Sequence, residues 1–387
     1  MELALYCPIH GYYEQKQDTI GRRGDFYTSV SVGSVFGELL AWQFAEWLLA
    51  IEVAKKLVGV NETRQKSHCS KSAEGGSGQH VPAKTGRMLI IEAGAHNGTL
   101  AKDILSWLRL HRPTVFQRLD YCIIEPSLRR RTWQQAVLVG LEKKVQWVSN
   151  LREVGTSNQS ATHCSESNID GIIFSNELLD SFPVHRYGWD AKKQEWFEWG
   201  VVVRDGEFAW TRLWEKKSGG NLDLAKHPGL AALMVLQEHL PHEFMIEVSP
   251  AAENWWREAG KLLNCGHLLS FDYGFTAAEM LAPERRHGTL RSYHQHQSGW
   301  DVLENPGKQD LTAHVNFEAI QEAGEQVGLQ TQTVSTQEEF LTRLFAQACK
   351  AERGFHEWDS KRIRQFQTLI HPDHLGTRYR VLLQTRI

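Results

Sequence analysis

Two acidic residues and two glycines are the first features of this sequence whose types and spacing could do chemistry. In the stretch LIIEAGAHNGTL, Glu92 closes an apolar run, and Gly94 and Gly98 bracket a short turn before a segment with helical spacing. Glu125 closes the next apolar run, YCIIEP. Parallel strands of a doubly wound sheet bring their carboxyl ends to one crevice, so both acids should lie there. The glycines would let a ligand approach the N–H groups at a helix start, although a tight turn without a ligand explains them almost as well.

The acid on the second strand favours a nucleoside ligand. A carboxylate in that position can accept hydrogen bonds from both hydroxyls of a ribose. A nicotinamide dinucleotide would use the same acid, but its pyrophosphate is typically bound by the denser pattern G-x-G-x-x-G, which this sequence lacks. S-adenosylmethionine has no phosphate, and a looser glycine turn flanked by an acid such as Glu92 can meet its amino acid end and its sulfonium charge. The spacing therefore favours S-adenosylmethionine.

Longer stretches of the chain resemble the MidA family of class I S-adenosylmethionine-dependent methyltransferases. The resemblance implies that Glu92, Gly94 and Gly98 form the cofactor turn and that Glu125 binds the ribose. The family usually has a second glycine where this chain has His96, which implies that the β-carbon and ring of His96 turn away from the ligand. A mitochondrial member methylates an arginine of a respiratory complex I subunit, so the resemblance also implies a protein arginine as acceptor. The matching stretches are MELALYCPIHGYY, GDFYTSVSVGSVFGELL, EAGAHNGTLAKDIL, IIEPS, SNELLDSFPVHR, EVSPAA, FDYG, PGKQDLTAHVNF and HPDHLGTRYRVLLQ.

A third group of polar residues, Asn176, Glu177 and Asp180, follows the apolar run GIIF and should lie at the same edge of the sheet. Methyl transfer is an in-line displacement, so the protein mainly has to position the acceptor and exclude water. A guanidinium acceptor stays protonated at neutral pH and needs carboxylates that orient it and accept charge as a proton leaves. We therefore predict these three as the catalytic residues. Alternatively, Glu177 caps the next segment or Asp180 closes a turn before Pro183.

Four more residues are candidates with equally good structural explanations. Asp25, in GDFYTS, could fold over the cofactor, as the resemblance also implies, or form a Gly-Asp turn before a helix. Asp272 and Tyr273 end the run SFDYG and could line the acceptor site, or the tyrosine could be a buried residue bonded to a neighbour. The resemblance places His314, in DLTAHVNF, in the substrate-side region; otherwise an Asp or Thr of this stretch caps the following helix.

Histidines and tryptophans elsewhere give weaker signals. His294 and His296 lie one residue apart without a third ligand at a fixed spacing, so we predict no metal site. An aromatic-rich segment around Asp205-Gly206 should be an antiparallel β insertion over about 186–214. We expect its tryptophans to form its own small core, with a grip on a partner protein as the alternative. These are Trp189, Trp196, Trp199 and Trp210.

The chemistry-bearing residues require a sheet covered on both faces. Continuous apolar runs alternate with helical patterns, which predicts a doubly wound, Rossmann-like α/β sheet, and RYRVLLQT near the end predicts its last strand. The polar, Gly/Ser-rich stretch that follows the first long helical pattern has the composition of a flexible loop. We expect a lead and packed helix over 1–60, a flexible loop over 61–86, the methyltransferase core over 87–275 plus 371–387, and a helix-rich substrate-side segment over 276–370.

Charge and composition exclude several classes of protein. The 43 Lys and Arg against 46 Asp and Glu give a formal charge of -3, which predicts no nucleic-acid partner. No apolar run approaches the roughly 20 residues that span a membrane. The start, MELALYCPIHGYY, has the pattern of neither a signal nor a transit peptide, so we expect a cytoplasmic protein. The sequence leaves open whether the chain forms a homodimer.

Together these features predict an S-adenosylmethionine-dependent methyltransferase that acts on an arginine side chain of a protein. The main alternative is a non-catalytic assembly or binding protein that keeps the fold, because His96 replaces a glycine of the cofactor turn. A nicotinamide-dependent oxidoreductase is the second alternative, because it would share the sheet and Glu125.

Overall fold

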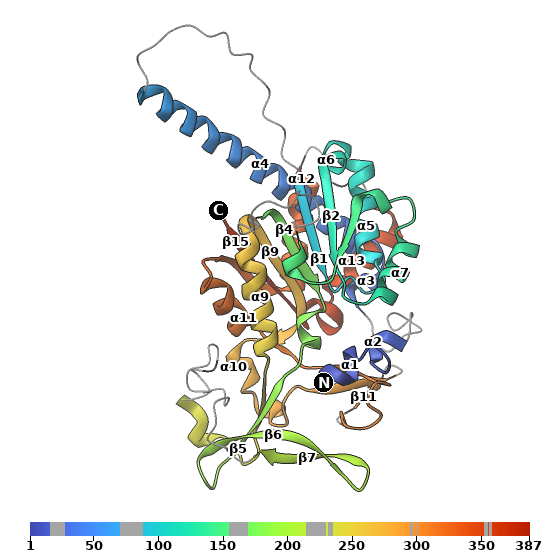
Figure 1. Cartoon of the computed structure of the whole chain (residues 1–387), viewed down its shortest axis with the longest axis vertical. Helices are drawn as coiled ribbons and strands as arrows, with labels where there is room; N and C mark the ends of the chain where they lie inside the picture. Colours follow the sequence, from blue (N-terminus) through green and yellow to red (C-terminus); the bar gives the residue numbers. More distant parts are fainter. Residues whose placement is uncertain are drawn as a thin grey trace.

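The computed structural model describes residues 1–15, 28–69, 88–154, 169–213, 230, 235–294, 297–299, 301–351, 355 and 358–387. Within these residues, the central sheet has eight strands, seven of them in the order β14-β15-β9-β4-β1-β2-β3, with β13 beside β9 (Figure 1). The strands are β1 (Met88–Ala93), β2 (Leu119–Ile124), β3 (Val145–Val148), β4 (Ile169–Asn176), β9 (Leu263–Phe275), β13 (Val315–Asn316), β14 (Gln330–Thr336) and β15 (Tyr379–Arg386).

The direction of the strands confirms the doubly wound sheet. Strands β3, β2, β1, β4 and β9 run parallel to one another, whereas β15 is antiparallel to both β9 and β14. The parallel strands are the continuous apolar runs of the sequence, and the central ones are buried on both faces as such runs predict. Strand β15 is the expected last strand.

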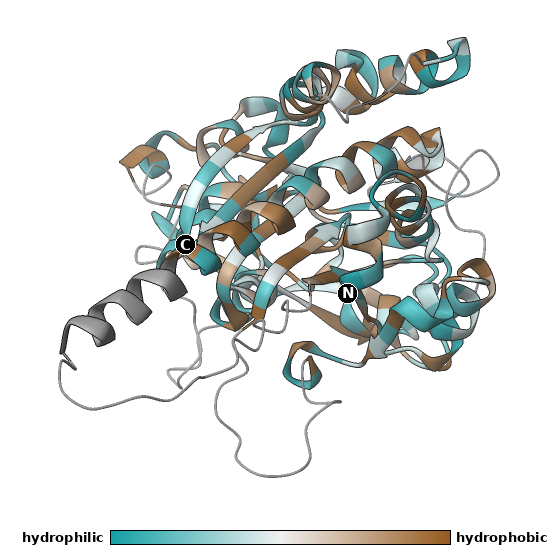
Figure 2. Cartoon of the chain, turned by 90° about the horizontal axis from the view of Figure 1, so that it is seen from above, coloured by the Kyte–Doolittle hydropathy of each residue, from teal (hydrophilic) through white to brown (hydrophobic). Residues whose placement is uncertain are grey.

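Helices cover both faces of the sheet. One face packs against α4 (Val35–Cys69), α5 (Thr99–His111), α12 (Gln337–Lys350) and α13 (Ser360–Ile370). The other face packs against α9 (Pro250–Leu262) and α11 (Phe317–Glu325). Phe36 of α4 contacts Phe271 edge to face, with ring centroids 5.2 Å apart, and Phe44 contacts Phe174 in a tilted arrangement at 5.0 Å. Hydrophobic residues line the surfaces where helices and sheet meet (Figure 2). The two apolar layers hold the strand ends, and hence the site, in place.

The remaining helices are short connections. They are α1 (Glu2–Tyr6), α2 (Tyr12–Gln15), α3 (Ser29–Val32), α6 (Pro113–Arg118), α7 (Leu128–Val137) and α10 (Ala277–Met280). Single turns lie at Glu142–Lys144, Leu151–Glu153, Leu179–Ser181, Gln237–His239, Pro283–Arg285 and Pro372–Gly376. Among the described residues, no helix has both the length and the apolar character needed to cross a membrane.

Helix α4 is longer than the sequence pattern predicts. The expected loop begins at residue 61, but α4 continues to Cys69. Residues 61–69 contain neither proline nor glycine and include Glu, Arg, Gln and Lys, which have good helix propensity, so polarity alone did not end the helix. The rest of the expected loop, from residue 70, lies outside the described residues.

The predicted antiparallel insertion is confirmed as a four-stranded sheet. Its order is β7-β6-β5-β8, from β5 (His185–Asp190), β6 (Glu195–Arg204), β7 (Glu207–Leu213) and β8 (Met245–Val248). The β6–β7 hairpin turns at Asp205 and Gly206, both with positive φ. Trp189 is buried in the core of the insertion and Trp196 packs against it, while the guanidinium of Arg212 lies over the ring of Trp199. Strand β8 lies beyond the expected bounds of about 186–214 but pairs with β5 in this sheet.

The segment 276–370 is less helical than expected. Besides α10 to α13 it contains a small sheet of β10 (Arg291–His294), β11 (Gln297–Gly299) and β12 (Asp310–Thr312), and it supplies β13 and β14 to the main sheet. Strand β14, QTQTVST, lies at the sheet edge, where polar residues are tolerated and no continuous apolar run marks the strand. The helix cap expected from Asp310 or Thr312 is provided by Asn316, whose side chain accepts from the N–H groups of Glu318 and Ala319.

Candidate active site

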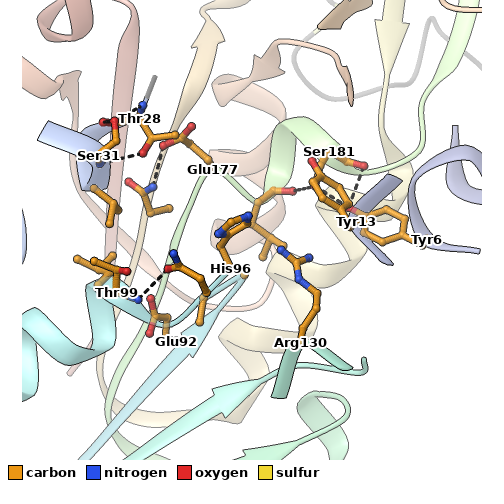
Figure 3. A pocket seen from close by; sticks show the side chains of 17 residues that line it. Tyr6, Tyr13, Thr28, Ser31, Glu92, His96, Thr99, Arg130, Glu177 and Ser181 are labelled. Atoms are coloured by element: carbon orange, nitrogen blue, oxygen red, sulfur yellow. Dashed lines mark hydrogen bonds between the residues drawn. The ribbon is translucent and has the colours of Figure 1, made fainter. Parts of the chain in front are cut away.

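A pocket opens at the carboxyl ends of β1 and β4, where a doubly wound sheet binds its ligands (Figure 3). The space within it is about 930 Å³, including its open mouth. The pocket wall comes from β1, β4, the starts of α3 and α5, helix α7 and the N-terminal helices. Its lining residues include Tyr6, Tyr13, Thr28, Ser31, Glu92, Gly94, His96, Asn97, Thr99, Arg130, Asn176, Glu177 and Ser181.

The turn after β1 has the left-handed backbone that its glycines predict. Gly94, His96 and Gly98 have φ values of 76°, 46° and 86°. A β-carbon at Gly94 would lie 3.2 Å from the side chain of Leu178, and one at Gly98 would lie 3.3 Å from the backbone of Gln134. Both glycines are therefore required by backbone conformation and by close packing. Gly94 lines the pocket, whereas Gly98 holds the start of α5.

His96 does not turn away from the pocket. It adopts a backbone conformation in which glycine is favoured, and its side chain lies at the pocket wall (Figure 3). Burial, together with the positive charge of Arg130, lowers the pKa of His96 to about 3, so the imidazole is neutral at physiological pH. The expectation that the His96 ring points away from the pocket is therefore wrong. The surrounding chain buries the residue on the side of the pocket, so its ring lies at the pocket wall.

Glu92 stands in the pocket wall as predicted. It is buried, and its Oε2 accepts a hydrogen bond of 2.8 Å from the hydroxyl of Tyr121. Burial raises the pKa of Glu92 to about 8, and the Tyr121 hydrogen bond opposes this shift. A nearby positive charge would favour the ionised form. Glu92 is thus suited to a cationic group of a ligand.

Glu125 lies one side chain away from the pocket rather than in its lining. Its carboxylate accepts from the N–H of Ser127 at 3.0 Å and from Nε2 of Gln134 at 3.1 Å, and Arg130 Nε lies 3.8 Å from its Oε2. Arg130 lines the pocket, and Gln134 also donates to the carbonyl of His96. Burial raises the pKa of Glu125. The sequence predicted an acid at the end of this strand, but it could not show that other side chains separate Glu125 from the pocket.

Asn176 and Glu177 end β4 inside the pocket. Glu177 has a positive φ of 54°, and its Oε1 accepts from the side chain of Asn176 at 2.9 Å. Burial raises the pKa of Glu177 to about 8; the Tyr379 hydroxyl opposes the shift, and the charge of Asp272 adds to it. The Oδ1 atom of Asn176 is buried and has no hydrogen-bond partner within the described part of the chain. This wall of the pocket therefore offers an unused acceptor and a half-buried carboxylic acid.

Behind Glu177 lies a cluster of buried acids. Asp272 accepts from the N–H groups of Leu178 and Leu179 at 3.1 and 2.7 Å, so it holds the loop that carries Asp180. Burial raises the pKa of Asp272 to about 7. Burial also raises the pKa of Asp180 well above its usual range, and the charges of Asp272, Glu177 and Asp310 add to the effect. The charges of these acids disfavour the ionisation of Asp180, whereas a bound cation would favour it.

The remaining predicted residues are divided between the acid cluster and a second pocket. The ring of Tyr273 packs against that of Tyr379 in a tilted arrangement, with centroids 4.1 Å apart. Burial raises the pKa of Tyr273, and the charge of Glu177 adds to this effect. His314 lines a smaller neighbouring pocket with Glu247, not the main one, and burial lowers its pKa to about 4. Asp25 lies outside the described residues, as does His296.

Several residues of the site were not predicted. Tyr6 and Tyr13 come from the N-terminal helices, Arg130 from α7, Asp310 from β12 and Tyr379 from β15. Arg130 follows Glu125 closely and could have been found from that spacing. The others approach the site only through contacts between distant parts of the sequence, for which the local pattern holds no signal.

The strand order, the antiparallel β15 and the pocket at the carboxyl ends define a class I methyltransferase fold. Residues 78–335 match the model of a family described as "Putative S-adenosyl-L-methionine-dependent methyltransferase", and this chain belongs to that family. The chain is therefore a methyltransferase whose cofactor is S-adenosylmethionine. Family membership leaves the nicotinamide alternative without support.

Individual relatives agree with this assignment. The chain is 25% identical to the mitochondrial protein arginine methyltransferase NDUFAF7 of Xenopus laevis, over 98% of this chain and 78% of the relative. It is also 25% identical to the Danio rerio protein of the same name, over 84% of this chain and 68% of the relative. A Burkholderia thailandensis crystal structure with bound S-adenosyl-homocysteine superposes with a TM-score of 0.74 at 24% identity, over 100% and 86% of the two chains.

The comparisons also correct the expected cellular compartment. The expectation of a cytoplasmic protein is contradicted by the relatives, which are named as mitochondrial proteins. Targeting signals lie in segments that need not belong to the folded domain. The sequence of a folded core therefore predicts the cellular compartment poorly.

The residues of the pocket fit S-adenosylmethionine. Glu92 offers a negative group for the cationic amino acid end, the turn Gly94–Gly98 brings backbone close, and Asn176 has a buried acceptor to share. Glu125 lies behind this wall, with Arg130 beside it at the end of β2, and does not line the pocket itself.

Proposed function

We propose that this methyltransferase transfers the methyl group of S-adenosylmethionine to the guanidinium of an arginine in a protein substrate. The observation that supports this acceptor is the acid cluster of Glu177, Asp180, Asp272 and Asp310, which adjoins the cofactor pocket. A guanidinium is planar, keeps its charge at neutral pH and pairs with carboxylates in a fork, so a buried cluster of acids matches it better than a neutral acceptor. The relatives named as protein arginine methyltransferases agree.

Each residue then has a distinct task. Bound S-adenosylmethionine supplies an electrophilic methyl group on a sulfonium. Glu92 would hold the cationic end of the cofactor and Glu125 its ribose. Glu177, at the pocket wall, would become ionised when the guanidinium binds, orient the acceptor nitrogen and accept the proton that it loses on methylation. Asp180 would hold the other edge of the guanidinium, while Asp272 keeps the loop in position.

A binding protein without catalysis is the alternative, and one observation favours it. His96 brings a side chain into the pocket at a position where glycine would leave space. If the ring blocks the cofactor, the fold would serve only for assembly or binding. We also propose a mitochondrial location, because the relatives carry mitochondrial names.

The test begins with calorimetric titration of the purified protein with S-adenosylmethionine, S-adenosylhomocysteine and NAD. Binding of the first two alone, followed by transfer of a labelled methyl group to acetyl-Gly-Arg-Gly-amide but not to acetyl-Gly-Lys-Gly-amide, is the expected result. Mass spectrometry of the product peptide would place the methyl group on the guanidinium. Absence of S-adenosylhomocysteine binding would favour the binding-protein alternative, and methylation of the lysine peptide would refute the assignment of arginine.

A further inference from the structure

The N-terminal helices α1 and α2 contact the cofactor side of the site. The Glu14 carboxylate accepts a hydrogen bond of 2.9 Å from the hydroxyl of Ser127, and the Glu14 carbonyl accepts one from Arg129. Ser127 caps α7 and donates its own N–H to Glu125. Residues 1–15 are therefore attached directly to the turn that carries the predicted ribose acid.

The same helices contact the acceptor side. The hydroxyl of Tyr6 lies 2.6 Å from the hydroxyl of Ser181, which follows Asp180. The hydroxyl of Tyr13 donates to Oδ1 of Asp310 at 2.8 Å, across 297 residues of sequence. Leu5 and Tyr12 pack in one apolar cluster together with Leu311, which follows Asp310 in the sequence. The N-terminal helices thus connect two halves of the site that come from different parts of the chain.

Tyr13 is the residue that touches both halves by itself. The guanidinium of Arg130 lies 5.1 Å from the centre of its ring, a cation–π distance, while its hydroxyl holds Asp310. Arg130 in turn lies beside Glu125, and both Tyr13 and Arg130 line the pocket (Figure 3). The ring of Tyr13 therefore contacts the cofactor half of the site, and its hydroxyl contacts the acceptor half.

We propose that Tyr13 is a positioning residue that couples the cofactor and acceptor halves, with its ring fixing Arg130 beside the ribose acid and its hydroxyl fixing the carboxylate of Asp310. This inference rests on the proposed function, because it takes Glu125 as the ribose acid and Asp310 as part of the acceptor site. Strand β12 has three residues, and Asp310 Oδ1 also accepts from the N–H of Leu311, so the Tyr13 bond helps to orient this carboxylate. Cofactor binding at Glu125 then orders the acceptor side, and the coupling is reciprocal.

Three variants separate the ring from the hydroxyl. Tyr13→Phe keeps the contact with Arg130 and removes the bond to Asp310, whereas Tyr13→Ala removes both. Tyr187→Phe is the matched control, because Tyr187 lies in the core of the insertion and its buried hydroxyl has no hydrogen-bond partner among the described residues. Each variant is titrated with S-adenosylhomocysteine and assayed with acetyl-Gly-Arg-Gly-amide.

For Tyr13→Phe we expect KM for the peptide to rise about tenfold, with kcat and the S-adenosylhomocysteine Kd nearly unchanged, since one hydrogen bond to a charged group is lost. For Tyr13→Ala we expect both KM and Kd to rise, and for Tyr187→Phe neither. An unchanged KM in Tyr13→Phe would overturn the role of the hydroxyl. If Tyr13 had only a structural role, both Tyr13 variants would be less stable than the wild type. Tyr13→Phe would then not raise KM while leaving Kd unchanged.

Hydrogen exchange makes the coupling testable without a peptide. Adding S-adenosylhomocysteine should slow amide exchange at residues 310–312 in the wild type and in Tyr187→Phe, but not in Tyr13→Ala. If the wild type binds S-adenosylhomocysteine and exchange there does not change, the coupling is refuted. If the exchange effect is present but no arginine peptide is methylated, the proposed acceptor is wrong and the coupling stands.

Discussion

Glu177 combines an uncommon backbone conformation with a half-buried carboxylate. Its φ of 54° is rare for a residue with a side chain, and such residues concentrate at functional sites. Its N–H donates to the carbonyl of Phe271, and its carboxylate accepts from Asn176, so the position is held by contacts from β9 and β4. The chain keeps a costly conformation that presents this acid at the pocket wall.

Removing the charge of Glu177 should slow catalysis while sparing the cofactor. We expect Glu177→Gln to lower kcat by about 10²-fold, the usual contribution of a proton-accepting group. In the wild type, kcat/KM should rise with pH toward about 8, where the free carboxyl ionises, and this rise should disappear in the variant. Methyl-transfer assays from pH 6 to 9 test both points, with S-adenosylhomocysteine affinity as a check on the pocket. Glu258→Gln, at an exposed ion pair of α9, is the control, and equal rates in the two variants would refute the role.

The ribose assignment of Glu125 can be tested separately. Glu125→Ala should weaken S-adenosylhomocysteine binding by about 1–3 kcal/mol, because a charged hydrogen-bonding partner is lost. Glu125→Gln keeps the shape that Ser127 and Gln134 surround, so it separates the loss of charge from local collapse. Titration calorimetry gives the affinities, and unfolding curves show whether the fold is retained. An affinity equal to that of the wild type in both variants would show that Glu125 only supports α7.

At the scale of elements, the sequence predicts what local patterns encode. Apolar runs located β1, β2, β4 and β15, and the glycines located the turn after β1. The edge strand β14 was missed because polar residues at a sheet edge leave no apolar run. The insertion was predicted too short, because β8 joins it from beyond residue 214 and a four-residue strand carries no information on its partner.

The cofactor turn owes its shape to three left-handed residues, and this gives a prediction for His96. A β-branched side chain is poorly tolerated at positive φ, so His96→Val should lower the free energy of unfolding by about 1–2 kcal/mol. Asn adopts this conformation more easily, so His96→Asn is the matched control and should be close to the wild type. Urea unfolding monitored by tryptophan fluorescence measures the difference. Equal stability of the two variants would mean that the turn relaxes to another conformation.

At the scale of the whole molecule, the acceptor site is assembled from distant segments. Glu177 and Asp180 follow β4, Asp272 belongs to β9, and Asp310 belongs to β12. Sequence reasoning found three of these four acids because each follows or ends an apolar run of the sheet. Asp310 joins them through folding of the segment after β9, and the N-terminal tyrosines join across the widest separation. The complete site therefore depends on long-range packing that no short motif describes.

The buried acids should make the stability of the ligand-free protein depend on pH. Burial raises the pKa values of Glu92 and Glu177 to about 8, from an ordinary value of 4.5. Between these values the folded protein holds protons that the unfolded chain has released, so the stability that they contribute is complete below about pH 4.5 and is lost as pH rises through about 8. His96 and His314 affect stability only at lower pH. Because their pKa values are lowered, they reduce stability only as pH falls below about 6.5. From pH 7 to 9 the acids alone should dominate.

We therefore expect the free energy of unfolding to fall between pH 7 and pH 9, by about 1 kcal/mol for each such acid. Glu177→Gln is uncharged throughout, so its stability should fall less steeply than that of the wild type over the same interval. Urea unfolding of the ligand-free protein at pH 7, 8 and 9 measures both slopes, and Glu258→Gln, which changes an exposed acid, should follow the wild type. Parallel slopes for Glu177→Gln and the wild type would show that Glu177 is already ionised at pH 7. Its role as a proton acceptor would then need no bound cation to prepare it.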